Sequence, residues 1–323
     1  MKAIVYTQYG SPDVLAFKEI PTPTPKDNEV LIKLCAASVN PLDWHFMRGT
    51  PWPVRLMIGL FKPRRTVLGC DIAGRVVAVG KDVKLLQPGD EVFGGVELGG
   101  FAEFVCAVED KLAPKPANLS FEEAAAVPVA AITALQGLRD QGGIKPGQRV
   151  LVDGASGGVG TFAIQIAKCF GAEVTAVCST AKMETARALG ADHVIDYTRE
   201  DFSHSGQLYD LIFAANAHRS LFAYRRAMKP GGVYVMAGGG GAQILQTVFL
   251  RPLISRVGSK KMRGLLAKMN NKDLVFLKEL LEDRKIAPVI DRRYPLSDAA
   301  DAIRYLEEGH ARGKVVLTVE NGR

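Results

Sequence analysis

A glycine-rich stretch at residues 154–160 has the residue types and spacing of a loop that binds phosphate groups. It follows a short apolar run at 149–152, which predicts a buried strand, and it precedes an amphipathic pattern from about Val159 to Phe170, which predicts a helix. Gly157 would let the backbone approach a pyrophosphate, and Gly160 would permit close packing of helix and strand. The N–H groups and the dipole at the start of the helix would attract the phosphates. The stretch reads Gly154-Ala155-Ser156-Gly157-Gly158-Val159-Gly160, with Ala155 in place of the usual first glycine.

We expect residues 156–160 to bind a dinucleotide, because the stretch sits between a predicted strand and a predicted helix. The end of the next predicted strand, residues 173–178, indicates which dinucleotide. NAD sites place an acidic residue there to hold the ribose 2′-hydroxyl. This strand is followed instead by Ser179, Thr180 and then Lys182, with no acid. A hydroxyl and a lysine suit a 2′-phosphate, so the sequence predicts NADPH rather than NADH. The alternative for Lys182 is an ordinary surface lysine.

The pattern of the chain changes near Ser120, which indicates two domains. Residues 1–124 hold short Val-rich runs separated by Gly and Pro turns, which predict a β-rich unit. Between residues 125 and 286 strands alternate with helices, which predicts a parallel sheet. Residues 287–323 return to strand patterns, so we assign them to the first unit. The predicted fold class is α/β, with a doubly wound parallel sheet inserted into a β-rich domain.

Composition and charge narrow the functional classes. The chain has 323 residues, of which 47% are hydrophobic, and no apolar run reaches the length that spans a bilayer. Residues 1–10 lack the pattern of a secretory signal, so we expect a cytoplasmic protein that does not bind membranes. The net charge of +7 permits nucleic-acid binding, but aromatic residues are not interleaved with basic ones, so we do not favour that partner. One basic concentration comprises Arg251, Arg256, Lys260, Lys261, Arg263 and Lys268.

Several further motifs occur in a fixed order along the chain. They are Ser38-Val39-Asn40-Pro41-Leu42-Asp43, Leu68-Gly69-Cys70-Asp71-Ile72-Ala73-Gly74, Gln87-Pro88-Gly89-Asp90-Glu91-Val92, Gly99-Gly100-Phe101-Ala102-Glu103-Phe104, Lys229-Pro230-Gly231-Gly232 and Gly313-Lys314-Val315-Val316. Together with the glycine-rich stretch they resemble the quinone oxidoreductases, a zinc-independent branch of the medium-chain dehydrogenase/reductase superfamily. The resemblance covers nearly the whole chain. It implies a Rossmann sheet beside a GroES-like β-barrel catalytic domain, and a homodimer formed through the edges of the Rossmann sheets.

The zinc-dependent branch of that superfamily differs at the positions of its metal ligands. It carries Cys where this chain has Asn40, His where this chain has Cys70, and Cys or Asp near Val129. A single soft ligand cannot hold a catalytic zinc, which needs about three protein ligands. None of the five cysteines forms a Cys-x-x-Cys pair, which argues against a structural zinc lobe. We therefore expect no metal site.

The resemblance also assigns roles to individual residues. Asn40 and Asp43 resemble catalytic residues at the nicotinamide and substrate end, although turn capping is an alternative for Asn40. Thr133 resembles the threonine near the nicotinamide ribose or pyrophosphate, and Tyr197 joins Ser179 and Lys182 in the 2′-phosphate cluster. Lys314 resembles a basic residue near the cofactor. A buried helix hydroxyl is the alternative for Thr133, and an ordinary half-buried tyrosine is the alternative for Tyr197.

Without a metal, the acceptor must take hydride unaided, which favours a quinone or an α,β-unsaturated carbonyl. The Asn40 amide is our candidate donor to a developing enolate. Two other functions remain open: an enoyl reductase of a biosynthetic pathway, and a non-catalytic NADPH-binding protein. Neither His45 nor His310 is a convincing general acid. The roles of residues 44–65 and 243–268, the physiological substrate and the direction of the reaction are left undetermined.

Overall fold

The computed structural model describes residues 1–239 and 259–319. The chain forms two compact units. Unit 1 comprises Met1–Val129, Met269–Arg284 and Pro288–Arg323, and unit 2 comprises Ala130–Lys268 and Lys285–Ala287. Each unit has its own sheet, and each is described by itself.

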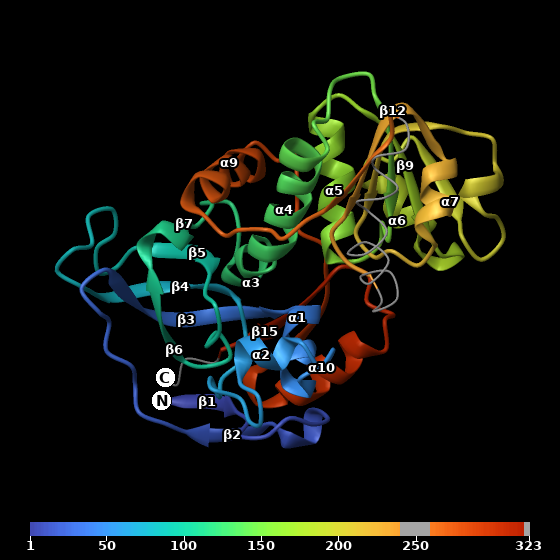
Figure 1. The fold of residues 1–323 in the computed structure, drawn as a ribbon. Helices are drawn as coiled ribbons and strands as arrows, with labels where there is room; N and C mark the ends of the chain where they lie inside the picture. Colours follow the sequence, from blue (N-terminus) through green and yellow to red (C-terminus); the bar gives the residue numbers. More distant parts are fainter. Residues whose placement is uncertain (240–258, 320–323) are drawn as a thin grey trace. The chain divides into compact units, whose positions relative to one another are not determined.

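Unit 1 is built on a seven-stranded sheet and a separate two-stranded ribbon (Figure 1). Strand β3 (Glu29–Val39) is its centre, because β4, β6 and β15 all pair with it. The side chains of Val30, Ile32 and Leu34 are fully buried on one face of β3, as the period-2 pattern of a strand predicts. The other strands are β1 (Lys2–Val5), β2 (Ala16–Glu19), β4 (Asp71–Val79), β5 (Glu91–Gly95), β6 (Phe104–Val108), β7 (Leu112–Pro114), β14 (Ile290–Pro295) and β15 (Lys314–Thr318).

Short helices connect many of the strands of unit 1. A helix starts at Ser120, near which the pattern of the sequence changes: the Ser120 hydroxyl accepts from the N–H of Glu123, whose carboxylate accepts from the N–H of Ser120. The Ala-rich segment that follows divides at Pro128 into two helices. The helices that involve unit 1 are α1 (Pro41–Arg48), α2 (Val54–Ile58), α3 (Phe121–Ala125), α4 (Pro128–Leu135, which enters unit 2), α9 (Asn271–Glu282) and α10 (Ala299–Glu307), with one-turn helices η1 (Pro12–Val14), η2 (Glu109–Lys111) and η6 (Leu296–Asp298).

Unit 2 is a six-stranded, fully parallel sheet in the order β10-β9-β8-β11-β12-β13. This confirms the α/β fold class and the predicted strands and helices between residues 149 and 236. The strands are β8 (Arg149–Asp153), β9 (Glu173–Cys178), β10 (His193–Asp196), β11 (Tyr209–Ala214), β12 (Met228–Met236) and β13 (Lys261–Gly264). The helices are η3 (Gln136–Gln141), α5 (Gly158–Cys169), η4 (Thr180–Lys182), α6 (Met183–Ala188), η5 (Phe202–His204) and α7 (Leu221–Arg226).

Two expectations about the later part of the chain need correction. The pattern of residues 243–270 is weak and looks helical or loop-like, but Lys261–Gly264 form β13, which extends the parallel sheet beside β12. Residues 243–258 of that segment lie outside the described residues. A four-residue edge strand with alternating basic residues gives too weak a pattern to predict.

The expected domain boundaries also differ from the observed units. Residues 269–284 group with unit 1 and not with the dinucleotide-binding unit, and the first boundary follows Val129 and not residue 124. Helix α9 packs against unit 1, since the Asn271 amide donates to the carbonyl of Leu112 and the Asn118 amide donates to the carbonyl of Leu281. These are long-range contacts, which the local pattern of the sequence does not reveal.

Candidate cofactor and catalytic sites

The glycine-rich stretch joins β8 to α5 at the carboxyl edge of the unit 2 sheet. Gly154 has a φ of +77°, a conformation that favours glycine, and it turns the chain away from the strand. A Cβ on Gly160 would lie 2.2 Å from the carbonyl oxygen of Gly154, so only glycine fits there. The role expected for Gly160, close packing at the start of the helix, is therefore present in the structure. The methyl group of Ala155 is fully buried, so an alanine fits at this position.

Gly157, unlike Gly154 and Gly160, has a backbone conformation and surroundings that would accept a side chain. It is the N-cap of α5 with φ −81° and ψ 175°, which any residue adopts. The nearest atom to a Cβ at this position would be the Gly154 carbonyl oxygen at 3.9 Å, an ordinary contact. The fold does not need glycine at 157. A ligand that approaches the backbone at the first turn of α5 would need it, and the N–H groups of that turn have no carbonyl within their own helix to bond.

The expected 2′-phosphate residues meet at the same edge of the sheet. Strands β9 and β10 are parallel neighbours with Cys178 opposite Asp196, so Ser179 and Tyr197 leave the sheet side by side. The N–H of Tyr197 donates to the carbonyl of Cys178 at 3.1 Å and joins the two strand ends. Lys182 ends the one-turn helix that Ser179 caps. Because these two strand ends adjoin, Ser179, Lys182 and Tyr197 lie at one corner of unit 2, which we call the 2′-phosphate corner.

This corner carries both basic and acidic groups. Asp196 ends β10 next to Tyr197, and its carboxylate accepts hydrogen bonds from the hydroxyls of Thr180 and Thr198. Those two hydroxyls are the main cause that holds the pKa of Asp196 below its usual value. Arg199, which the sequence analysis missed, lies with Nε 3.7 Å from the same carboxylate and is largely exposed. The sequence signal that could have identified Arg199 was its position two residues after Tyr197.

Thr133, the remaining residue expected in unit 2, lies on α4 and is partly exposed. Asn216, which follows β11, lies next to the glycine-rich stretch, because a Cβ on Gly154 would be 2.9 Å from its own Cβ. Asn40, Asp43 and Lys314 belong to unit 1 and are described there.

A buried network of charged and polar groups occupies the carboxyl end of β3 in unit 1. Asp71 is fully buried at the start of β4, and its carboxylate is the centre of the network. One oxygen accepts from the Ser38 hydroxyl at 2.7 Å, the Asn40 amide at 2.9 Å and the Lys314 ammonium at 3.0 Å. The other accepts from the backbone N–H of Val129 at 2.8 Å. The sequence alone assigned no separate role to Asp71.

The Asn40 side chain is fixed by its neighbours in this network. Its carbonyl oxygen accepts from Lys314 Nζ at 2.6 Å, and its Nδ2 donates to Asp71, with the Ser38 carbonyl 3.4 Å away. Both ends of the amide are therefore engaged within the protein. Lys314 is almost fully buried and uses two of its three N–H donors on Asn40 and Asp71, which leaves one donor.

Asp43 serves as a cap in the structure. One carboxylate oxygen accepts from the N–H of Asn40 at 2.7 Å, in the capping box that starts α1, and the other accepts from the N–H of Gly69 at 2.9 Å. It is fully buried. Burial raises the pKa of Asp43 from 3.8 to about 7, against the two N–H groups, which favour the ionised form.

This raised pKa predicts a pH dependence of stability. The folded protein holds the Asp43 proton more tightly than the unfolded chain does, so the contribution is full below pH 3.8 and is lost as the pH rises to about 7. We expect the unfolding free energy of the wild type minus that of Asp43→Asn to decrease over that range, by about 1.4 kcal/mol per pKa unit at most. Urea unfolding at several pH values measures it. A difference that grows with pH would contradict the direction.

The positions that hold zinc in the other branch have protein partners here. The Cys70 thiol is buried, donates to the Glu97 carbonyl, and has its pKa raised by burial. Asn40 is bonded to Lys314 and Asp71, as described. Among residues 1–239 and 259–319, no three His, Cys, Asp or Glu side chains are grouped so as to hold a metal ion.

Of the two histidines considered as acids, His45 is stacked on Trp44 with ring centroids 3.6 Å apart, and its Nδ1 lies 2.8 Å from the Thr50 carbonyl oxygen. Burial lowers the pKa of His45. His310 is exposed on the loop before β15. The contacts of His45 fit a packing role.

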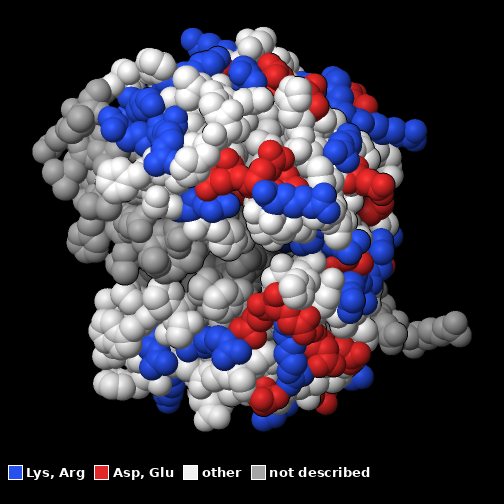
Figure 2. All heavy atoms as spheres, turned by 90° about the vertical axis from the view of Figure 1, so that its right-hand side faces the viewer, with Lys and Arg blue, Asp and Glu red and all other residues white. Residues whose placement is uncertain are grey.

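The surface charge is mixed on the face shown in Figure 2, where Lys and Arg are interspersed with Asp and Glu. No helix in the described part of the chain is long and apolar enough to cross a membrane.

The fold and these sites define a dinucleotide-binding oxidoreductase with a β-rich second unit, and comparison with known proteins identifies its family. Residues 26–117 match the family model described as the alcohol dehydrogenase GroES-like domain, and residues 189–317 match that described as zinc-binding dehydrogenase. The chain is 39% identical to a 2-methylene-furan-3-one reductase of Solanum lycopersicum, over 98% of this chain and 79% of that protein. It is 38% identical to an NADPH-dependent alkenal/one oxidoreductase, chloroplastic, of Arabidopsis thaliana, with the same coverage.

Solved structures give the same result. A quinone oxidoreductase from Coxiella burnetii superimposes with a TM-score of 0.87 at 33% identity, covering 99% of both chains. A structure described as an NAD-dependent alcohol dehydrogenase superimposes with a TM-score of 0.82 at 35% identity, covering 99% of this chain and 100% of that one. The chain belongs to the medium-chain dehydrogenase/reductase family, within its quinone oxidoreductase group, and is an oxidoreductase that uses a nicotinamide dinucleotide.

Proposed function

We propose that this protein transfers hydride from NADPH to a quinone or an α,β-unsaturated carbonyl without a metal ion. The observation that carries the proposal is Gly157, a glycine that the fold does not require at a helix start where a pyrophosphate would lie. The relatives' printed activities support the acceptor class: alkenals and enones for one, a furanone for another, and quinones for a third.

In this proposal the residues of unit 2 bind and orient the cofactor, which supplies the hydride. The backbone from Ser156 to Gly160 would hold the pyrophosphate, Thr133 would lie toward the nicotinamide ribose, and the corner formed by Ser179, Lys182 and Tyr197 would take the 2′-phosphate. Arg199 adds a further cation to that corner. In unit 1, Asp43 positions Asn40 through its backbone.

The contacts of Asn40 change its proposed role. Both ends of its amide are engaged, so we assign donation to a developing enolate oxygen to the remaining N–H of Lys314. Asn40 and Asp71 then orient that ammonium. Lys314 was expected near the cofactor, and a donor beside the reacting end of the nicotinamide is compatible with that expectation.

The test is the loss of NADPH absorbance with a small quinone and a small enone in turn. Turnover with NADPH that survives a chelator and a metal analysis without zinc would support the proposal. The faster acceptor would name the substrate class, and an acyl thioester as the best acceptor would favour the enoyl reductase. Binding of NADPH without turnover on any acceptor would favour a non-catalytic role.

Preference for NADPH over NADH is tested by changing the 2′-phosphate corner. We expect Lys182→Glu with Ser179→Asp to weaken NADPH binding by about 100-fold, because two anions replace a cation and a hydroxyl beside the phosphate. NADH binding should change by less than about threefold. Fluorescence titration of both cofactors measures this. Equal losses for NADH and NADPH would show that the corner does not contact the 2′-phosphate.

Assembly and location remain predictions. We propose a homodimer formed through an edge of the six-stranded sheet, whose outer strands are β10 and β13 among the described residues. Sedimentation gives the oligomeric state. A cytoplasmic location stays a prediction, since several relatives are named as chloroplastic or mitochondrial.

A further inference from the structure

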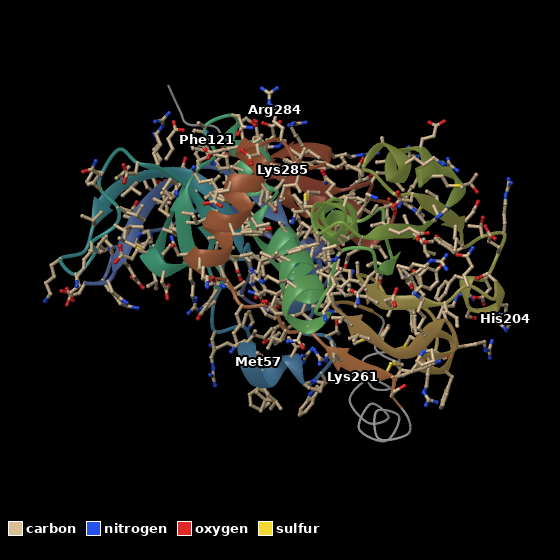
Figure 3. All side chains as sticks on the ribbon, turned by 90° about the horizontal axis from the view of Figure 1, so that it is seen from above. Met57, Phe121, His204, Lys261, Arg284 and Lys285 are labelled. Atoms are coloured by element: carbon tan, nitrogen blue, oxygen red, sulfur yellow. The ribbon has the colours of Figure 1, made fainter. Side chains whose placement is uncertain are left out.

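A cluster of large apolar side chains on unit 1 is exposed to solvent. It surrounds helix α2 and includes Phe61, which is 89% exposed, and Met57, which is 76% exposed. Figure 3 shows Met57 on α2, directed away from the strands of its own unit. We call residues 52–62 with Arg64 the α2 surface. Its exposed apolar members are Trp52, Leu56, Met57, Leu60 and Phe61.

The backbone beneath the α2 surface is firmly held. Gly59 ends α2 with a φ of +128°, and a Cβ there would lie 2.1 Å from the carbonyl oxygen of Lys62, so the chain turns tightly at this point. The Tyr9 hydroxyl donates to the Gly59 carbonyl. Arg55 donates to the Gly49 carbonyl at 3.0 Å and stacks over the Tyr9 ring at 4.6 Å. The apolar side chains are therefore presented on a tight turn that these contacts hold in place.

The charge around these side chains has one sign. Between Asp43 and Asp71 the sequence contains five basic residues and no acidic one. Lys62 and Arg64 are exposed, and the structure records no ion pair for either among the described residues. Arg65, next in the chain, is paired with Glu97 and so contributes less. An apolar patch bordered by Lys62 and Arg64 is complementary to a partner whose surface offers both apolar groups and negative charges.

We propose that the α2 surface docks unit 1 on an anionic lipid bilayer. Trp, Phe, Leu and Met side chains enter the boundary between headgroups and acyl chains, while Lys62 and Arg64 remain among the anionic headgroups. This differs from our expectation of a protein that does not bind membranes, which considered only spanning segments and overall charge. It does not depend on the proposed function, because docking requires neither cofactor nor acceptor.

A second copy of this chain is a poorer partner for the same surface. A two-fold interface would bring the α2 surface against itself and would gather Lys62 and Arg64 of both copies into one contact. Like charges gathered in this way disfavour association. A bilayer with anionic headgroups satisfies both the apolar and the charged members.

The test is co-sedimentation of the full chain with phosphatidylcholine vesicles, with and without a one-third share of phosphatidylglycerol. We expect binding to the anionic vesicles that weakens as ionic strength rises, and little binding to the neutral ones. Met57→Glu with Phe61→Glu should reduce partitioning at least about tenfold, since it removes the two most exposed apolar groups of the α2 surface and adds two anions. Lys62→Gln with Arg64→Gln should remove most of the preference for anionic vesicles.

Phe222→Glu is the matched control, since Phe222 is a 60% exposed aromatic on α7 of unit 2. It should bind vesicles as the wild type does. The proposal is overturned if the wild type does not sediment with anionic vesicles at low salt, or if neutral vesicles bind it equally. It is also overturned if Phe222→Glu lowers binding as much as the α2 variant does. If the α2 variant converts an oligomer to a monomer in size-exclusion chromatography, the surface is a contact between copies and not a docking surface for lipid.

Discussion

Replacing Gly157 by aspartate is expected to weaken NADPH binding at least about 100-fold while leaving the unfolding free energy of the cofactor-free protein unchanged or raised by up to about 1 kcal/mol. Aspartate is a preferred N-cap residue, and its charge is favourable at a helix start, so α5 should not suffer. The same side chain would occupy the place of the pyrophosphate and repel it. Fluorescence titration with NADPH and urea unfolding measure the two effects separately.

Gly160→Ala provides the contrast for this experiment. Its Cβ would lie 2.2 Å from the Gly154 carbonyl oxygen, so we expect a loss of about 1–3 kcal/mol in unfolding free energy together with weaker binding. If Gly157→Asp binds NADPH as tightly as the wild type, the cofactor does not approach the start of α5, and the central observation behind the proposed function is lost.

The different roles of these two glycines show what the sequence could predict. Strand β8, the glycine-rich stretch and α5 are consecutive in the chain, and each has a local pattern: a short apolar run, a glycine spacing and a helical period. The same local patterns predict which residues meet at one edge of the sheet, because parallel strands bring their carboxyl ends together. Ser179 and Tyr197 could be placed at one corner for that reason.

The network around Asp71 could not be predicted in this way. Its partners Ser38, Asn40 and Lys314 lie 33, 31 and 243 residues away in the sequence, on or next to strands that pair only in the folded sheet. The resemblance to the family named Asn40 and Lys314 but not the carboxylate that joins them. A buried carboxylate with four donors gives no local signal, because neither burial nor partners can be read from a single acidic residue in an apolar run.

Lys314→Met is expected to lower the unfolding free energy of unit 1 by about 3–5 kcal/mol, because it leaves the Asp71 carboxylate buried without a counter-charge. Asp71 is fully buried and Lys314 is 4% exposed, so water cannot replace the lost partner. Tryptophan fluorescence during urea unfolding reports on this unit selectively, since Trp44 and Trp52, the two tryptophans of the chain, both belong to it.

Lys278→Met is the matched control for that experiment, because Lys278 pairs with Glu282 in the same unit but at the surface of α9, and its loss should cost no more than about 0.5 kcal/mol. If the Asp71–Lys314 pair is the cause, Asp71→Asn combined with Lys314→Met should destabilise unit 1 by clearly less than the two single changes added together. Additive losses would mean that each residue acts through other contacts. In that event the ammonium of Lys314 would not be oriented by Asp71, and its assignment as the donor to the acceptor oxygen would lose its structural support.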